Sequence, residues 1–285
     1  MSKDTIPIPR GRFAVVGIYA LLALSALIAL FPLLWAISSS FSPNQDVFRY
    51  AYPFSWRSLV PLNFTLEGYA SLFQQGFGRA MINTLVLGIV TVIGGGLICA
   101  AAGFAFARFE FPFKNLLFGV VIITFMVPAD LTAIPRYLLV SQLGWVNTWA
   151  ALIVPGLANS LVIFLFKQYF EEIPEEIIEA ARIDGANWWV IFTRIVLPLS
   201  KPILVAAALI LFLSQWEAFF WPLLVAPAPE LQLVQTAITS IAVSEYKTVW
   251  NELFAGSMLA AIVPILLTLP LQRYYVQAVT GSVKG

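Results

Sequence analysis

Long stretches without charge constrain this chain more than any other feature of its sequence. Four of them contain no Asp, Glu, Lys or Arg: 13–45, 80–107, 137–166 and 253–272. Each reaches or exceeds the ~20 residues that a helix needs to cross ~30 Å of hydrocarbon. Two more stretches hold one acid each, Asp130 in 115–135 and Glu217 in 202–229. The pattern predicts an all-α polytopic membrane protein with six transmembrane helices.

Composition excludes several other classes of protein. Of the 285 residues, 60% are hydrophobic and 11% are charged, whereas a soluble domain carries about 25% charged residues. A net charge of +1 provides no basic field for nucleic acid. One cysteine and no histidine exclude a disulfide framework, the usual zinc sites and histidine-based catalysis. No Gly-rich loop precedes Lys and Ser or Thr, so we expect the chain not to bind ATP in the Walker manner. We expect no catalytic residue, metal or cofactor on this chain.

The six spans predict an order of segments along the chain. These are a cytoplasmic N-terminal segment (1–12), the first transmembrane helix (13–38), an extracytoplasmic loop (39–79), a core with five transmembrane helices (80–275) that includes a charged loop (167–201), and a cytoplasmic C-terminal tail (276–285). The first apolar run is longer than the roughly 7–15 residues of a signal-peptide core, so it counts as a span.

The basic residues predict the orientation of these spans. With the N-terminus inside, the cytoplasmic segments hold Lys3, Arg10, Arg12, Arg108, Lys114, Lys167, Arg182, Arg194, Lys201, Arg273 and Lys284. The outer segments hold the remaining five, Arg49, Arg57, Arg79, Arg136 and Lys247. Because cytoplasmic loops carry the excess of Lys and Arg, both termini are expected in the cytoplasm.

Aromatic residues and prolines are concentrated in two outer loops. The first loop is long and contains, among others, Trp56, Phe64 and Tyr69, and the fifth loop adds Tyr246 and Trp250. Long loops are usually functional or disordered, and this one has too many aromatic residues for disorder. We expect a packed extracytoplasmic cap that offers a docking surface. For most of the aromatic residues, a place in the interfacial belt is the simpler interpretation.

The most charged stretch, 167–201, predicts a short helical hairpin. Pro174 suits a first helical turn, and Gly185 suits a left-handed cap at the end of that helix. A second helix is expected to start near Asn187 and to end at 197–198. Such a hairpin could lie on the membrane surface. Its net acidic face suits anionic lipid poorly, however, and its small residues would allow another protein to approach closely.

Small and apolar residues recur in this hairpin at a fixed spacing. The order is Glu179, Ala180, Ala181, three residues, Gly185, nine residues, and then Ile195, Val196, Leu197 and Pro198. This order resembles the EAA loop of permease subunits of ABC importers. The resemblance implies a type I ABC importer permease fold in the inner membrane of a prokaryote. It also implies that this loop couples the chain to an ATP-binding subunit.

The resemblance extends over most of the chain and points to the carbohydrate branch, specifically the maltose-type subunit with six spans. The matching segments are 83–85, 107–112, 143–149, 216–223 (WEAFFWPL) and 272–285 (QRYYVQAVTGSVKG). It implies a dimer of ATP-binding subunits that holds ATP and Mg, a second homologous permease, an extracytoplasmic solute-binding protein and a sugar as cargo. The lipid bilayer is a further partner, and nucleic acid is not one.

Two other functions stay open from the sequence. One is an ABC permease for another small solute, such as a glycerol phosphate ester, and the other is a secondary transporter driven by an ion gradient. An anionic cargo would favour cationic groups along its path. The interiors of the predicted spans contain no Lys or Arg, which favours a neutral sugar, although the partner permease could serve an acidic one.

The fifth span contains our candidates for the translocation path. Glu217 stands where the family commonly has Asn, and an ionisable group in a span normally faces a partner or a water-filled cavity. With Gln215, Trp216 and Phe220 it combines the polar and aromatic groups that suit a sugar. The alternative is that Glu217 pairs within the bundle and that the tryptophan lies in the interfacial belt.

Other intramembrane residues are expected to have structural roles. Asp130 follows a proline and predicts a turn or helix break. Asn83, Thr84 and Asn159 are expected to join helices by hydrogen bonds rather than to line the path. Small residues in the second span, at 94–96 and at Gly103, predict close contact with another helix.

Overall fold

The structure is a computed structural model that describes the backbone of residues 12–242 and 248–281 and the side chains of 15–240 and 248–272. Every regular element in these ranges is helical, which confirms the predicted all-α class. Contacts divide the chain into unit 1 (Met1–Gln75 with Ile241–Met258) and unit 2 (Gly76–Ser240 with Leu259–Gly285). The predicted roles of Lys3, Arg10, Tyr246, Lys247 and Lys284 concern positions outside the described residues.

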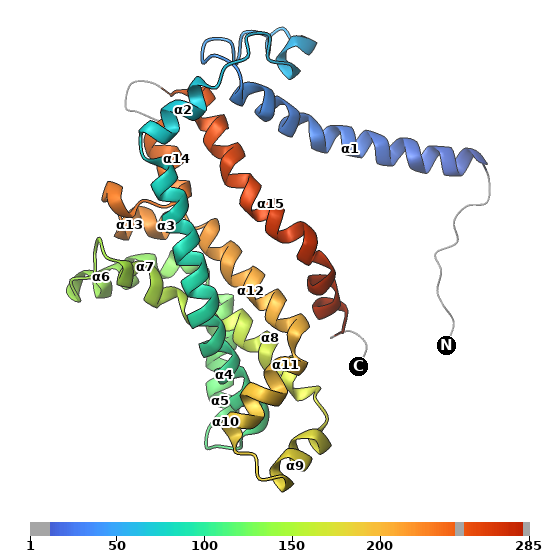
Figure 1. Ribbon diagram of the computed structural model, residues 1–285, viewed down its shortest axis with the longest axis vertical. Helices are drawn as coiled ribbons and strands as arrows, with labels where there is room; N and C mark the ends of the chain where they lie inside the picture. Colours follow the sequence, from blue (N-terminus) through green and yellow to red (C-terminus); the bar gives the residue numbers. More distant parts are fainter. Residues whose placement is uncertain (1–11, 243–247, 282–285) are drawn as a thin grey trace. The chain divides into compact units, whose positions relative to one another are not determined.

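Four helices of the described chain are long and apolar enough to cross a membrane. They are α1 (Arg12–Ser40); α3 (Phe77–Val90), which continues through the π-helical turn η2 (Thr91–Gly95) into α4 (Gly96–Arg108); α7 (Trp149–Ile153), which continues through η4 (Val154–Gly156) towards α8 (Ser160–Glu171); and α15 (Trp250–Gly281). Figure 1 shows α1 and α15 as long ribbons and α3 continuing into α4.

Two further spans are broken rather than straight. In the first, α5 (Lys114–Met126) meets η3 (Ala129–Thr132) and α6 (Ala133–Gln142) with a bend of 100°. In the second, the segment Trp188–Leu199 meets α12 (Lys201–Trp216) with a bend of 85°. When each bent pair counts as one span, the described residues contain the predicted six. Asp130 lies in η3, so the predicted helix break is confirmed.

Two of the predicted apolar stretches contain more than one element. The stretch 137–166 begins inside α6, and the span itself starts at Trp149. The stretch 202–229 contains α12, then α13 (Phe220–Val225) and the start of η6 (Pro229–Leu231). Helix α13 packs against α6 and α7. An uncharged sequence therefore covers both lipid-facing helices and short helices that pack on protein, and charge alone does not separate them.

Close helix packing in unit 2 depends on small residues. Helices α4 and α8 lie side by side, and a Cβ atom on Gly103 would stand 2.6 Å from Cβ of Phe166. A Cβ atom on Gly95 would stand 3.0 Å from the carbonyl oxygen of Leu157. These distances leave no room for a methyl group, so the predicted close contact of the second span is confirmed.

Polar side chains join the helices of unit 2, as predicted. The Asn83 Nδ2 donates to the carbonyl oxygens of Glu230 and Gln232 at 2.9 Å and 3.0 Å. Oγ1 of Thr84 accepts from the backbone N–H of Val234, the first residue of α14 (Val234–Ala242), at 2.8 Å. These hydrogen bonds hold α3 against η6 and the segment that follows it.

Unit 1 contains α1, η1 (Trp56–Leu59), α2 (Glu67–Gln74) and the start of α15. Its part of the loop 39–79 forms a packed cap, and the extracytoplasmic position of that cap stays a prediction. The Phe41 ring stacks on Phe64 with centroids 5.1 Å apart, and Trp250 packs on Phe48 at 5.0 Å. Trp56 and Phe64 remain 75% and 65% exposed, so the packed cap presents aromatic surface. Docking on that surface stays a prediction.

Candidate functional site

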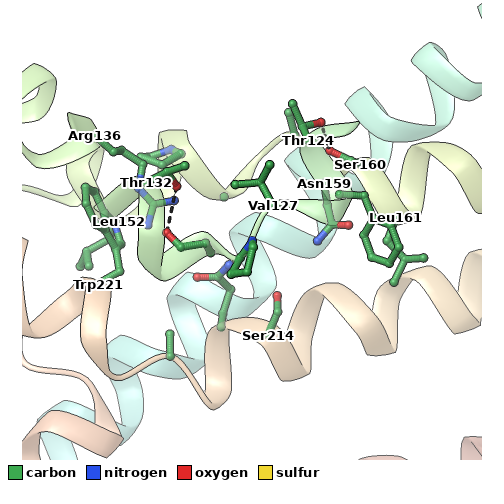
Figure 2. Close-up of a pocket in the computed structure, with 18 of the residues that line it drawn as sticks. Thr124, Val127, Thr132, Arg136, Leu152, Asn159, Ser160, Leu161, Ser214 and Trp221 are labelled. Carbon is green, nitrogen blue, oxygen red and sulfur yellow. Dashed lines mark hydrogen bonds between the residues drawn. The ribbon is translucent and has the colours of Figure 1, made fainter. Parts of the chain in front are cut away.

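A pocket of about 690 Å³ opens in unit 2 where three spans break or end (Figure 2). Its wall combines the C-terminal end of α5, the N-terminal end of α8 and the C-terminal end of α12, with η3, α6 and α13 beside them. The lining includes Thr124, Arg136, Asn159, Ser160, Gln215 and Trp221. A volume of this size falls within the range that small-molecule sites occupy.

Arg136 lies in the pocket wall, in contrast to the sequence-based prediction. The sequence places it in an outer segment and predicts no Lys or Arg inside the spans, whereas Arg136 belongs to the bent helix pair that counts as one span. The bend at η3 instead turns α6 so that its guanidinium lies over the Trp221 ring, 3.9 Å from the ring centroid. Nε1 of Trp221 donates to the carbonyl oxygen of Ala151 at 3.0 Å, which holds the indole in place.

Other polar groups of the pocket come from helix ends. Asn159 caps α8, and its Oδ1 accepts from the N–H of Val162 at 3.1 Å. The hydroxyls of Thr124 and Ser160 are 2.8 Å apart and share a hydrogen bond. The side chain of Asn159 therefore caps its own helix and lines the pocket, whereas the sequence predicts that it joins two helices.

The four predicted path residues do not lie together. Gln215 lines the pocket, where Gly156 leaves room for it: a Cβ atom on Gly156 would stand 2.9 Å from its Nε2. Trp216 is 2% exposed and donates through Nε1 to the carbonyl oxygen of Ala260 at 2.9 Å. Glu217 is the exposed C-cap residue of α12, and neither it nor Phe220 belongs to the pocket lining. Helix rotation thus separates residues that are neighbours in sequence.

The hairpin lies at the opposite ends of α8 and α12 from the pocket. Its first helix, α9 (Glu175–Ile183), starts after Pro174, as predicted. It ends in a left-handed residue, Gly185, with φ of +82°. The N–H of Gly185 donates to Arg182 at 3.0 Å, and the N–H of Ala186 donates to Ala181 at 2.9 Å. These two bonds form a Schellman cap, and the predicted end of the helix is confirmed.

The residues of the EAA pattern divide between two faces. Ala181 is buried, while Glu179, Ala180 and Gly185 are exposed. A Cβ atom on Gly185 would meet nothing within 4 Å, so the glycine serves the backbone turn and leaves an open surface. The hairpin therefore presents a carboxylate and small side chains on a face that the chain itself does not cover.

The second part of the hairpin starts and ends within one residue of the predicted positions. Oδ1 of Asn187 caps α10 (Trp188–Val190), which continues through the π-helical turn η5 (Ile191–Val196) into α11 (Leu197–Leu199). Leu197 and Pro198 lie inside this helix, which continues to Leu199 and bends before α12. A proline lacks the N–H that bonds backwards but does not prevent bonds from later residues. The N–H of Ser200 indeed donates to the carbonyl oxygen of Val196 at 3.0 Å.

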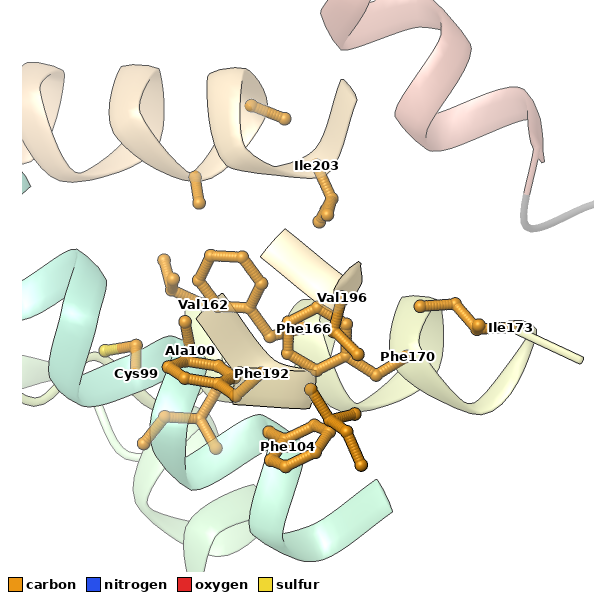
Figure 3. Close-up of a cluster of buried hydrophobic side chains, with 14 of the residues drawn as sticks. Cys99, Ala100, Phe104, Val162, Phe166, Phe170, Ile173, Phe192, Val196 and Ile203 are labelled. Atoms are coloured by element: carbon orange, nitrogen blue, oxygen red, sulfur yellow. The ribbon is translucent and has the colours of Figure 1, made fainter. Parts of the chain in front are cut away.

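Buried aromatic rings connect the hairpin to the spans. Figure 3 shows Phe104 of α4, Phe166 and Phe170 of α8 and Phe192 of η5 gathered in one cluster. Phe104 and Phe192 have centroids 5.2 Å apart, and Phe166 stacks on Phe170 at 5.4 Å. Ile195 packs at the edge of this cluster. The apolar face of the hairpin is thus part of the core of unit 2.

Arg108 reinforces that connection, and our sequence reasoning missed it. Its Nη2 donates to the carbonyl oxygens of Phe170 and Ile173, and its Nη1 lies 3.4 Å from Oε2 of Glu175. Its side chain is 7% exposed. One side chain therefore links the end of α4 with the end of α8 and the start of α9. The available signal was an arginine that directly follows an apolar span, which we counted only as a cytoplasmic charge.

Comparison with known proteins shows the same kind of protein throughout. Residues 93–281 match the family described as binding-protein-dependent transport system inner membrane component. The sn-glycerol-3-phosphate transport system permease proteins of Escherichia coli and Salmonella typhi are each 32% identical over 274 residues, which is 93% of this chain and 96% of theirs. The fold is similar to a chain from a bacterial ABC transporter that imports the acidic polysaccharide alginate. That similarity has a TM-score of 0.80 at 22% identity and covers 96% of this chain and 99% of the other.

Among the described residues, no cluster of His, Cys, Asp or Glu could hold a metal ion.

Proposed function

The chain belongs to the family of inner membrane components of binding-protein-dependent transport systems, and we propose that it is a permease subunit of an ATP-driven importer for a sugar. Family members are transport components, so the chain itself is not an enzyme. An ion-gradient-driven transporter, which the sequence left open, does not agree with membership of this family.

The hairpin is the observation that carries this proposal. Glu179, Ala180 and Gly185 form an exposed face, while the other face packs into the core and Arg108 holds its base. Helices α8 and α12 run from this hairpin to the pocket. A movement of the hairpin would therefore reach the pocket through packed elements, as alternating access requires.

The remaining parts of the importer come from partners. A dimer of ATP-binding subunits would hold ATP and Mg and receive the hairpins, and a second homologous permease would complete the path. An extracytoplasmic solute-binding protein would deliver cargo to the exposed aromatic residues of unit 1. Both termini would then lie in the cytoplasm. The basic residues at the hairpin end of unit 2, such as Arg108, Lys114 and Arg182, support that orientation.

A glycerol phosphate ester is a second candidate for the cargo. The relatives named for sn-glycerol-3-phosphate share 32% identity over nearly the whole chain, which supports it. Both candidates are polyols, and the phosphate group separates the ester from a neutral sugar.

An affinity pull-down of the tagged chain from solubilised membranes tests the coupling function. We would compare wild type with Glu179→Lys and Gly185→Val. We expect an ATP-binding subunit and a second permease to co-purify with wild type. Both variants should lose the ATP-binding subunit and keep the second permease, because the first reverses a charge on the open face and the second strains a left-handed residue.

The matched control is Glu110→Lys, which reverses a carboxylate that is 90% exposed and lies outside the hairpin. This control should retain every partner. The coupling function would be wrong if no ATP-binding subunit accompanied wild type, or if both hairpin variants retained it unchanged.

A further inference from the structure

Arg136 is a cation of the pocket without an ionic partner of its own. Four ion pairs link described residues, and Arg136 belongs to none of them. Its guanidinium lies against the Trp221 ring, and its Nε is buried without a hydrogen-bond acceptor. Asp130 is near enough for Coulombic attraction but does not form an ion pair. An ionisable side chain at such a position normally faces a counter-charge or a water-filled cavity.

We infer that this pocket receives an anionic substituent of the cargo, a carboxylate or a phosphate ester, and that Arg136 is the residue that recognises it. This inference rests on the proposed function, because it concerns what the importer carries. It also reverses our preference for a neutral sugar, which depended on the absence of a cation from the spans.

The geometry suits an oxyanion. The ring of Trp221 covers one face of the guanidinium, and its own hydrogen bond to Ala151 fixes the ring. Stacking leaves the N–H groups at the edge of a guanidinium to donate in its plane, which matches the two oxygens of a carboxylate or phosphate. A lysine could not offer this planar pair of donors.

The remaining polar groups suit the neutral part of a polyol. No described group hydrogen-bonds to the side-chain amide of Gln215, and the Nδ2 of Asn159 donates to none. With the hydroxyls of Thr124 and Ser160 they provide donors and acceptors for sugar hydroxyls. The predicted cargo is therefore a small anionic carbohydrate or polyol ester rather than a simple inorganic anion.

Two other sources could supply the anion. One is the phosphate of a lipid headgroup, and the other is an acidic side chain of the second permease. Both would occupy Arg136 without any cargo, so they predict that added solute has no effect on the pocket.

Protection of a pocket thiol from a maleimide distinguishes these sources. The reporter is Ser214→Cys, because Ser214 lines the pocket and the native Cys99 is 0% exposed. The maleimide would label the assembled importer, in nanodiscs of phosphatidylcholine, in the presence of digalacturonate, of its carboxyl-reduced neutral counterpart, or of glycerol phosphate. Arg136→Gln removes the charge, Arg136→Lys keeps it without the planar fork, and Arg79→Gln removes an exposed charge outside the pocket.

We expect at least one anionic probe to slow labelling of the reporter, and the neutral probe to have no effect. Arg136→Gln should raise the half-protecting concentration at least about tenfold, since that is what hydrogen bonds to a charged group contribute. Arg136→Lys should be intermediate, and Arg79→Gln should match wild type.

The inference is overturned if the neutral probe protects equally, if Arg136→Gln changes nothing, or if neither anionic probe protects. It is also overturned if phosphatidylglycerol in the nanodisc protects the thiol without solute, because the anion would then be a lipid headgroup. The ATPase activity of the same samples tests the proposed function separately. Its absence from wild type would reject the importer, whereas its presence in all variants leaves the labelling result to decide the cargo alone.

Discussion

Arg108 illustrates how one residue can connect two parts of this molecule. The carbonyl groups at the end of a helix have no partner within that helix. The Arg108 guanidinium satisfies those of Phe170 and Ile173 near the end of α8 and approaches Glu175 in the first turn of α9. A positive charge is also favourable at a helix C-terminus. The residue therefore positions the hairpin without belonging to the EAA pattern.

Arg108→Ala should lower the free energy of unfolding by about 2–3 kcal/mol, because hydrogen bonds to charged groups contribute about 1.5–3 kcal/mol each and the carbonyl oxygens of Phe170 and Ile173 each lose a charged donor. Thermal unfolding of the detergent-solubilised chain measures this loss. The control is Lys114→Ala, which removes an ion pair with the 90% exposed Glu110 and should cost less than about 1 kcal/mol. Equal unfolding temperatures for the two variants would contradict the proposed position of Arg108.

At the scale of elements, the contact between α4 and α8 depends on the missing side chain of Gly103. Its α-carbon lies so close to α8 that a Cβ atom would stand 2.6 Å from Cβ of Phe166 and 3.0 Å from the backbone nitrogen of Lys167. The latter atom belongs to the backbone and cannot rotate away. The aromatic cluster that supports the hairpin begins at this contact.

Gly103→Ala should therefore destabilise the chain by about 1–3 kcal/mol, the usual cost of overpacking a core. Gly119→Ala is the matched control, because it adds the same methyl group to a helix where nothing lies within 4 Å. The control should be neutral or slightly stabilising, since alanine favours helix over glycine. Gel filtration and thermal unfolding in detergent check both variants, and indistinguishable profiles would refute the close contact.

At the scale of the whole molecule, the distribution of basic residues predicts the orientation in the membrane. The hairpin should face the cytoplasm, because six basic residues lie at its end of unit 2, namely Arg108, Lys114, Lys167, Arg182, Arg194 and Lys201. The loop 39–79 is predicted to lie outside the cytoplasm. When each bent pair counts as one span, the described residues contain six spans, and an even number of spans places both ends of a chain on the same side of the membrane.

Cysteine labelling in intact cells tests this orientation. Leu62→Cys lies in the outer loop at a residue 54% exposed, and Ile183→Cys lies in the hairpin at a residue 87% exposed. A membrane-impermeant maleimide should label only Leu62→Cys until the cells are permeabilised, after which it should label both. The opposite pattern would invert the predicted topology.

The sequence by itself determined the elements that have local causes. A membrane span needs a long charge-free stretch, so the helical class and the approximate positions of the spans could be predicted from the positions of charge, although charge alone did not separate spans from short helices packed on protein. The hairpin could be predicted because Pro174, Gly185 and Asn187 act through their own backbone and side chain on the nearest turn.

Only the tertiary structure decided which polar residues meet. The same pattern of charges is compatible with any rotation of a helix and with a break inside a span, because both depend on packing against distant residues. The bend at η3 therefore turned Arg136 from a predicted loop residue into part of the pocket wall. The rotation of α12 placed Gln215 in the pocket, Trp216 in the core and Glu217 at an exposed helix end.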